Sequence, residues 1–300
     1  MSGHLSYHEG ELAVQARVGV GSGGIGADEM YRPVMGAGVQ HFLAAQQIAV
    51  LSTMDNQGRL WASMRSGPPG FLRSLDEHAV EIGGHSHPKD PLFRNLKRAS
   101  ATGMLVINLA ARHRVRLNGV AQLDRQGNVL LTVNQVYGNC PQYIQARQIH
   151  AEREASPAPA RPLKKLDERL RRWVETSDTL FLATGHPQSG LDASHRGGKP
   201  GFVRVEDEQR LVFPDYPGNN MFNSLGNITT NPKAGLLFPD FESGNALQLS
   251  GTAQVLWDDP RIADFPGARR LVAFEIERGM ELPQATLLTF EFQGYSPHLR

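Results

Sequence analysis

The feature that most constrains this chain is an internal repeat. Residues 62–71 and 193–202 share the pattern Ala-Ser-x-Arg-x-Gly-x-Pro-Gly-Phe, with Ser63 and Ser194 lying 131 residues apart. Matches at one constant spacing across a ten-residue segment are improbable by chance. The chain therefore contains two related segments, and any fold proposed for one must suit the other.

The repeat extends well beyond this motif. Upstream, the apolar run 48–53 aligns with 179–184 at the same spacing, and downstream 117–122 aligns with 249–254 after a gain of one residue. We therefore interpret the chain as two copies of one domain of ordinary size. The predicted parts are an N-terminal extension (1–27), a first repeat with its tail (28–150), a Pro- and Ala-rich linker (151–162) and a second repeat with its tail (163–300).

Each copy shows the same order of secondary-structure patterns. Apolar residues at helical spacing begin each copy, namely Met35, Val39, Phe42 and Leu43 in the first and Leu166, Leu170, Trp173 and Val174 in the second. Short apolar strands bounded by Gly and Pro turns follow. The strands expected in the first copy are 48–53, 60–65, 79–82, 104–108 and 115–121, with a short helix around 92–96. This order predicts a mainly β fold with flanking helices, built from small antiparallel barrels.

Composition excludes several classes of protein. A net charge of +1 argues against nucleic acid as the main partner, because duplex binding normally needs a basic face. The lone Cys140 excludes an intramolecular disulfide framework and fits a reducing compartment. No apolar run has the length of a membrane span, and the N-terminus lacks a signal-peptide pattern. We therefore expect a cytoplasmic protein that binds neither nucleic acid nor membranes.

A glycine-rich segment in the N-terminal extension fits a dinucleotide motif on spacing alone. Gly19, Gly21 and Gly24 satisfy G-x-G-x-x-G, and residues 11–20 would have to supply the preceding strand. The next segment lacks a second parallel strand that ends in an acidic residue. A connecting loop is the favoured interpretation.

The second copy of the motif carries the best candidate for an anion site. Ser194, Arg196 and Lys199 place a hydroxyl and two cations close together, and Gly197 lets the backbone approach a ligand. Further on, Asn219 and Asn220 lead into a short helix expected at 221–228, whose N-terminus would expose unpaired N–H groups. Together these features predict a phosphate site.

Ordinary structural roles remain open for the same residues. Arg196 would then pair with Asp192 on the surface, and Asn219 and Asn220 would be turn and capping residues. His85 and His87 are one residue apart, but without further ligands nearby a loop pair is favoured over a metal site. No metal site is predicted, and we expect Cys140 to be a packed structural thiol.

The copies differ in a way that favours one anion site over two. Where the second repeat has Lys199, the first has Pro68. Conversely, the basic run that contains Arg112, Arg114 and Arg116 belongs to the first repeat and has no basic counterpart in the second. We predict one intact site in the second repeat, covered by the first.

These residues carry a family resemblance. The run 192–203, followed by 214–220, Asn231-Pro232 and 235–238, resembles the pyridoxamine 5′-phosphate oxidase-related family of FMN-binding split barrels. The resemblance covers roughly residues 40–123 and 175–257. It implies two six-stranded antiparallel split barrels in tandem, packed as a pseudo-dimer, with one FMN at their interface.

The resemblance also implies roles for particular residues. Ser194 and Arg196 would hold the FMN phosphate, supported by Gly197, Lys199, Asn219 and Asn220. A cation from Arg112, Arg114 or Arg116 would lie near the flavin. The C-terminus, 294–300, shows no counterpart of the substrate-binding segment of authentic pyridoxamine phosphate oxidases, so that substrate is not expected.

Three functions therefore remain open. The first is an FMN-dependent oxidoreductase acting on a small-molecule substrate or electron donor. The second is a non-catalytic flavin-binding or electron-transfer module, and the third is a haem-binding split barrel with His195, His85 or His87 as axial ligand. A monomeric pseudo-dimer and a homodimer both fit the repeat.

Overall fold

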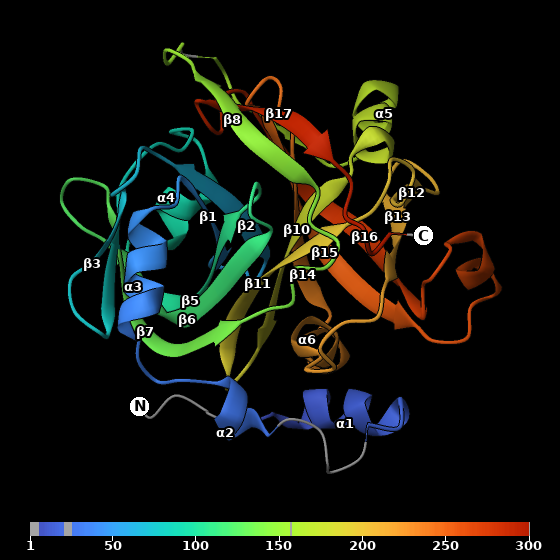
Figure 1. Ribbon diagram of the computed structural model, residues 1–300. Coiled ribbons are helices and arrows are strands. Elements are labelled where there is room, and N and C mark those ends of the chain that lie inside the picture. The colour runs from blue at the N-terminus through green and yellow to red at the C-terminus, as the bar shows by residue number, and fades with distance from the viewer. Residues whose placement is uncertain (1–5, 21–25, 157, 300) are drawn as a thin grey trace.

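The chain folds around two antiparallel sheets that share one strand order (Figure 1). The computed structural model describes residues 6–20, 26–156 and 158–299. The first sheet runs β2-β1-β5-β6-β7-β4-β3, and the second runs β11-β10-β14-β15-β16-β13-β12, with β9 added beside β16. Strand for strand the two orders are equivalent, as a duplicated domain requires.

The first half is built from these elements: α3 (Ala37–Ala44), β1 (Ile48–Met54), β2 (Leu60–Ser66), β3 (Leu72–Ser74), β4 (Ala79–Ile82), α4 (Pro91–Asn95), β5 (Ser100–Asn108), β6 (His113–Leu123), β7 (Val129–Gly138) and β8 (Ala146–Glu152). The second half is built from β9 (Arg161–Leu163), α5 (Glu168–Thr176), β10 (Thr179–His186), β11 (Gly190–Gly197), β12 (Arg204–Val205), β13 (Arg210–Asp215), α6 (Asn223–Thr230), β14 (Lys233–Pro239), β15 (Ala246–Leu256), the 3-10 helix η1 (Pro260–Asp264), β16 (Arg270–Leu282) and β17 (Leu288–Gly294).

The mainly β class predicted from the sequence is confirmed, with a difference in strand number. The sheets contain seven and eight strands rather than six, because the short strands β3 and β12 extend equivalent edges and β9 joins the second sheet. A β-bulge interrupts β6 at Asn118/Gly119 and β15 at Ser250/Gly251, which are equivalent positions. The duplication thus preserves an irregularity of the ladder as well as its order.

Two equivalent glycines bring the halves into close contact. A Cβ added to Gly103 in β5 would lie 2.6 Å from the Asp192 Cα, and one added to Gly235 in β14 would lie 2.6 Å from the Leu60 carbonyl oxygen. Each half therefore offers the same glycine to the same strand of the other half. This reciprocity is the pattern of a two-fold interface, here formed within one chain.

Three large apolar clusters make up most of the core in the described part of the chain. One lies within the first half and includes Met35, Leu51 and Val106, and one lies within the second half and includes Leu180 and Phe274. The remaining large cluster takes residues from both halves, listed in part as Val50, Met64, Leu105, Phe181, Leu237 and Leu282. The halves share a buried apolar core, so each half would expose apolar side chains without the other.

The tails of the two halves pair with each other as the ribbon β8–β17 (Figure 1). The chain continues from β7 through a loop into β8, a strand that the sequence patterns did not predict. The predicted linker is also shorter than expected, since β8 ends at Glu152 and β9 begins at Arg161. In both cases the decisive partner is a distant strand, which local patterns do not reveal.

The N-terminal extension forms a helix, α1 (Glu9–Arg17), that lies against α6 (Figure 1). Gly10 and Gly226 permit the close approach, because a Cβ on Gly10 would lie 2.3 Å from the Gly226 carbonyl oxygen. The strand that a dinucleotide motif would need at 11–20 is absent from this segment. Gly21 and Gly24 lie outside the described residues.

Within the part of the chain that the structure describes, none of the helices has the length and apolar character needed to cross a bilayer.

Candidate functional site

A cavity lies where the two halves meet, and we call it the junction cavity. Its volume is about 100 Å³. The first half contributes β6 and the segment after β7, and the second contributes β11, the end of β13 and the start of α6. The polar lining residues are Arg114, Arg116, Asn139, Cys140, Gln142, Tyr143, His195, Arg196, Asp215, Tyr216, Asn219, Asn220, Asn223 and Ser224.

Helix α6 points its N-terminus at this cavity. Its N-cap residue, Phe222, has left-handed backbone angles (φ 57°, ψ 25°) and gives no side-chain hydrogen bond to the helix. The residues of the first turn, Asn223, Ser224 and Leu225, line the cavity. The N–H groups of a first turn lack partners within the helix and carry partial positive charge, so this end attracts an anion.

Arg114 is a buried cation without an acidic partner among the described residues. Its Nη2 donates to the Cys140 carbonyl oxygen at 2.7 Å and its Nη1 donates to His195 Nδ1 at 3.1 Å, while Nε is buried without a partner there. Burial, and then the neighbouring charges of Arg116 and Arg196, lower the pKa of Arg114 to about 9. A buried charge normally has a counterion, so an anion in the cavity would complete this site.

The other two arginines of the cavity are neutralised within the protein. Arg196 donates to Asp215 at 2.7 Å, and Arg116 donates to Asp192 at 2.8 Å. Nε of each arginine has no hydrogen-bond partner in the described part of the chain. The alternative pairing of Arg196 with Asp192, left open by the sequence, is therefore not the one observed. Arg196 faces the cavity with donors still available.

His195 contributes a further donor. Its ring is 4 % exposed, and because Nδ1 accepts from Arg114, the proton of the neutral ring lies on Nε2. Nε2 is buried without an acceptor among the described residues. Burial and the surrounding arginines hold the pKa of His195 well below its usual range, which keeps the ring neutral. His195 is thus a neutral N–H donor in a cationic cavity.

Strained backbone conformations gather around the same cavity. Non-glycine residues with positive φ include Tyr143 (65°), Asn220 (59°) and Phe222 (57°), all of which line it. Such conformations are costly for residues with a Cβ and concentrate at functional sites. Tyr143 also stacks on Tyr216, with ring centroids 5.0 Å apart. This pair separates the junction cavity from a second cavity of about 300 Å³, lined in part by Arg269 and His298.

The equivalent place in the first half is closed by a side chain. Asp90, the N-cap of α4, accepts from Ser63 Oγ at 2.6 Å, from the Leu92 N–H at 2.9 Å and from Gln248 Nε2 at 2.9 Å. Asp90 aligns with Phe222 in the second half, and Gln248 aligns with Arg116. A carboxylate of the protein itself therefore caps the N-terminus of α4, whereas the equivalent N-terminus of α6 has no side-chain cap.

The arginine of this first-half site donates mainly to backbone carbonyl oxygens, although its Nε is buried without a partner in the described part of the chain. Arg65, the counterpart of Arg196, donates to the carbonyl oxygens of Gly84 and Gly127. The position of Arg114 is taken by Ala246. Burial raises the pKa of Asp90 to about 6. The two sites therefore differ in one respect: a carboxylate caps α4 in the first half, whereas no side chain caps α6 in the second.

The structure gathers five of the eight predicted site residues around the junction cavity: Arg114, Arg196, Gly197, Asn219 and Asn220. Three lie elsewhere. Ser194 is fully buried behind Ser224 and donates to the Leu182 carbonyl oxygen, Lys199 lies on the exposed turn after β11, and Arg112 donates to three carbonyl oxygens, those of Ile144, Gly294 and Tyr295.

Sequence reasoning missed several residues of the cavity. Ser224 takes the place expected for Ser194, and it could have been found from its position in the first turn of the expected helix. Cys140 lines the cavity and is not the packed structural thiol expected. Tyr143 and Tyr216 come together from distant segments, and no local signal marks that contact.

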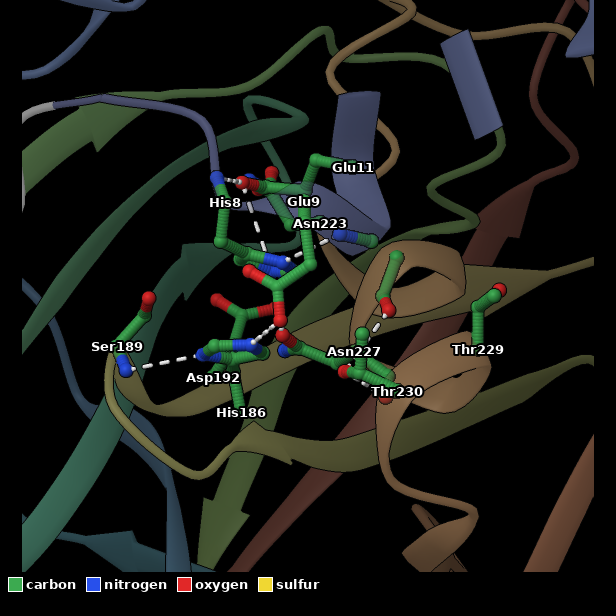
Figure 2. A network of polar contacts seen from close by, with 12 residues as sticks. His8, Glu9, Glu11, His186, Ser189, Asp192, Asn223, Asn227, Thr229 and Thr230 are labelled. Carbon is green, nitrogen blue, oxygen red and sulfur yellow. Dashed lines mark hydrogen bonds and ion pairs between the residues drawn. The ribbon is translucent and has the colours of Figure 1, made fainter. Parts of the chain in front are cut away.

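A second cluster of titratable groups lies where α1 meets α6 and β10 (Figure 2). His8, Glu9 and His186 bring their ligand atoms within 4.8 Å of one another. Yet His8 Nδ1 accepts from the Gly10 N–H, and His186 Nδ1 accepts from the Ser189 N–H. In the neutral rings the protons therefore lie on Nε2, which donates to Asn227 in one case and to Glu9 in the other.

This arrangement of protons favours a structural role, in which the histidines hold α1 against α6 and β10, over a metal site. A metal-binding histidine normally donates its second ring N–H to the protein, whereas both rings here accept at that nitrogen. The neighbouring Glu11 accepts from Asn223 and Tyr31, and burial raises its pKa to about 7. Since Asn223 is the first residue of α6, the N-terminal segment holds the helix end that faces the junction cavity (Figure 2).

The other histidines considered as ligands are also engaged. His85 Nε2 donates to the Gln284 carbonyl oxygen at 2.8 Å and His87 Nε2 donates to the Ala158 carbonyl oxygen at 2.9 Å. Because His87 Nδ1 also accepts from the Lys89 N–H, neither ring nitrogen of His87 has a free lone pair. The same holds for His195 Nδ1, which accepts from Arg114.

Fold and cavity together define a mainly β protein of two like sheets, with an uncapped helix end and unpartnered arginine donors where the halves meet. Residues 166–298 match the model of the family described as pyridoxamine 5′-phosphate oxidase. This match agrees with the family resemblance that the motifs of the second half carry. No curated protein matches the chain.

Three solved structures with similarity to the chain each match less than half of it. A putative pyridoxamine 5′-phosphate oxidase from Lactobacillus delbrueckii is 21% identical over 39% of this chain and 94% of its own, with a TM-score of 0.33. HupZ of Group A Streptococcus is 12% identical over 44% and 98%, with a TM-score of 0.32. HutZ of Vibrio cholerae, described as a haem storage protein, is 14% identical over 40% and 95%, with a TM-score of 0.30.

Proposed function

We propose that the chain binds one FMN through its phosphate in the junction cavity and acts as a flavin-dependent oxidoreductase on a small molecule. The observation that carries this proposal is Arg114, a buried cation without an acidic partner among the described residues, beside the uncapped N-terminus of α6. A dianionic phosphate supplies both the counterion and the acceptors for the first-turn N–H groups.

The donor set suits a phosphate in particular. Arg114 and Arg196 present guanidinium groups from two directions, and His195 adds a neutral N–H. Asp90 in the first half supports the same assignment, because its carboxylate accepts a hydrogen bond from the N-terminus of the equivalent helix, α4. The match of residues 166–298 to the family described as pyridoxamine 5′-phosphate oxidase also supports a phosphate-bearing ligand.

The size of the cavity limits what it encloses. About 100 Å³ accommodates a phosphate group but not a whole ligand, since small-molecule sites usually have about 300 Å³ or more. The adjoining cavity of about 300 Å³ shares Tyr143, Tyr216 and Pro217 with it. We propose that the rest of the cofactor extends toward this aromatic pair.

The protein's own contribution to the reaction would be placement and electrostatics. FMN, when bound, would supply hydride or electron transfer. Arg114 and Arg196 would fix the phosphate, and His195 would donate Nε2–H without changing protonation, because its pKa lies well below the usual range. Tyr143 and Tyr216 would shield one side of the cavity from water.

The same histidine geometry bears on the haem alternative. Axial ligation needs a ring lone pair, and His195 and His87 commit theirs to Arg114 and to the Lys89 N–H. His85 donates through Nε2 to the Gln284 carbonyl oxygen, so it is the candidate whose other ring nitrogen stays open to a haem. The non-catalytic alternative differs from the oxidoreductase only in turnover: it would hold FMN and show no reaction with nicotinamide donors.

We further propose a cytoplasmic monomer or homodimer whose partners are small molecules, neither nucleic acid nor membrane.

An absorption spectrum of the purified protein, recorded before and after FMN is added and the excess removed, tests the proposal. We expect flavin bands at one equivalent per chain. Two equivalents would mean that the first half binds as well, against the role given to Asp90. Absence of flavin, or a Soret band, would refute flavin binding.

A further inference from the structure

The only cysteine of the chain lies in the wall of the junction cavity. Cys140 follows β7 and is partly exposed, and its carbonyl oxygen accepts from Arg114 Nη2 at 2.7 Å. Arg196 and His195 line the same cavity. The thiol is therefore neither packed in the core nor free on an open surface: it lies among arginines.

A second observation shows that this cavity is prepared for an anion. His195 Nε2 and the Nε atoms of Arg114 and Arg196 are buried and lack partners among the described residues. The three residues that carry these donors line the same cavity as Cys140. A small molecule that carries a carboxylate would be attracted to this space and held next to the sulfur.

We propose that Cys140 is an anion-directed nucleophile that undergoes exchange with small disulfides bearing carboxylate groups. The Cys140 thiol first loses its proton to solvent. Its sulfur then attacks one sulfur of the disulfide, a new S–S bond forms, the old S–S bond breaks, and the other half departs as a thiolate with the electron pair. The protein ends as a mixed disulfide, and no further oxidant or reductant is needed.

The product would occupy the donors that hold a phosphate. Modification of Cys140 and binding of a phosphate-bearing ligand therefore exclude each other, which gives the site a thiol-dependent control. For FMN in particular this consequence rests on the proposed function. The reactivity of the thiol itself does not.

The test compares two disulfide reagents of similar shape and different charge. With Cys140 as the only thiol, 5,5′-dithiobis(2-nitrobenzoate), a dianion, and neutral 4,4′-dithiodipyridine each report one reacting group per chain. Their second-order rates are measured on the native chain and on the urea-unfolded chain at one pH. We expect the ratio of anionic to neutral rates to be at least about tenfold higher in the native chain, and to fall as salt is raised.

Equal ratios in the native and unfolded chains would overturn the proposal. So would a native thiol that reacts with neither reagent while the unfolded thiol reacts with both. Arg114→Gln should lose most of the native preference, whereas Arg125→Gln, an exposed arginine on a turn, removes the same charge and should keep it. Retention of the preference in Arg114→Gln, with both variants folded by circular dichroism, counts against the proposal.

Protection separates this inference from the proposed function and replaces the variants if Arg114→Gln fails to fold. Inorganic phosphate should slow the anionic reagent on the native wild-type chain, and FMN should slow both reagents. Protection by phosphate without protection by FMN leaves the thiol chemistry standing and refutes the flavin. An anionic preference that neither ligand reduces would place the thiol away from the donors and refute the inference.

Discussion

At the scale of single residues, the first-half site and the junction cavity differ at two equivalent positions. These two differences explain why a protein carboxylate fills the first site while no such group caps the helix of the second. Asp90 caps α4 and receives Ser63 and Gln248, whereas its counterpart Phe222 caps nothing. Arg114 brings a charge where the first-half site has Ala246. Each difference is small in sequence, and under the proposed function they replace an anionic group of the protein with that of a ligand.

Arg196 and Arg65 provide a matched pair to test this difference. Arg196→Gln removes a guanidinium that lines the cavity, and we expect the affinity for FMN and for inorganic phosphate to fall about 10- to 100-fold, the effect of losing hydrogen bonds to a charged group. Flavin fluorescence quenching and calorimetry with phosphate measure the two affinities.

Arg65→Gln should behave differently, because Arg65 binds only the carbonyl oxygens of Gly84 and Gly127 in the described structure. Its affinity for FMN should match the wild type while its unfolding midpoint falls. Similar losses of affinity in both variants would contradict the assignment of a single site to the second half.

Asp90 also predicts a pH dependence of stability. Burial raises its folded pKa to about 6, above the usual value of 3.8, so the native state holds the proton more tightly than the unfolded state. Its contribution to stability is present below about pH 4 and is lost as pH rises toward 6, by up to about 3 kcal/mol. Asp90→Asn should remove this loss, so the variant gains stability relative to wild type across that window.

Urea unfolding of both proteins at pH 4, 5, 6 and 7 measures this difference. Glu11, whose pKa burial raises to about 7, contributes equally to both and cancels. The carboxamide can keep the Ser63 and Leu92 hydrogen bonds and donate to Gln248 Oε1, which lacks a described partner. A difference between the two proteins that stays constant with pH would show that Asp90 does not titrate in this range.

At the scale of elements, periodicity and the repeat predicted most of the fold. The strands expected at 48–53, 60–65, 79–82, 104–108 and 115–121 all occur, within a few residues of β1, β2, β4, β5 and β6. Gly and Pro turns bound these short strands, so local chemistry fixes them. Five of the eight predicted site residues line the junction cavity, and their role in binding stays a prediction.

What the sequence did not reveal depends on contacts between distant segments. The ribbon β8–β17 joins residues about 140 apart, and α1 gains its place only by packing on α6. The 141–152 segment has no strong pattern of its own, so its strand exists because β17 pairs with it. Arg112 and Ser194 were predicted to bind the ligand because their donor groups suit a phosphate. In the structure both donate to backbone carbonyl oxygens instead.

The crossing of α1 and α6 predicts a coupling between the N-terminal helix and the anion site. Gly10→Ala places a methyl group against the Gly226 carbonyl oxygen, so α1 must move and Glu11 loses its position beside Asn223. We expect a stability loss of about 1–3 kcal/mol and weaker phosphate binding. Urea unfolding and calorimetry measure both quantities.

Gly38→Ala is the control for this helix prediction. Gly38 lies inside α3 with open space around its Cβ position, so alanine should stabilise the protein by up to about 1 kcal/mol and leave phosphate affinity unchanged. If Gly10→Ala binds phosphate as tightly as Gly38→Ala does, then α1 supports the fold without positioning the site.

At the scale of the whole molecule, the halves behave as two subunits joined in one chain. The glycines Gly103 and Gly235 make reciprocal contacts, and the shared apolar cluster contains residues of both sheets. The junction cavity uses the same arrangement, with β6 of one half facing β11 and α6 of the other. An isologous interface of this kind normally gives two identical sites, and the proposed function assigns only one of them to a ligand.

The interface predicts that both sheets lose stability together. Gly235→Ala would place a methyl group 2.6 Å from the Leu60 carbonyl oxygen, a backbone atom that cannot move aside without shifting β2. Because β2 belongs to the first sheet, a substitution in the second half should reduce hydrogen-exchange protection in β1 and β5 as well as in β14 and β15. Gly138→Ala, with open space around its Cβ, should change neither. Loss of protection confined to the second sheet would mean that the halves fold independently, and a ligand at their junction would then bind without stabilising the first half.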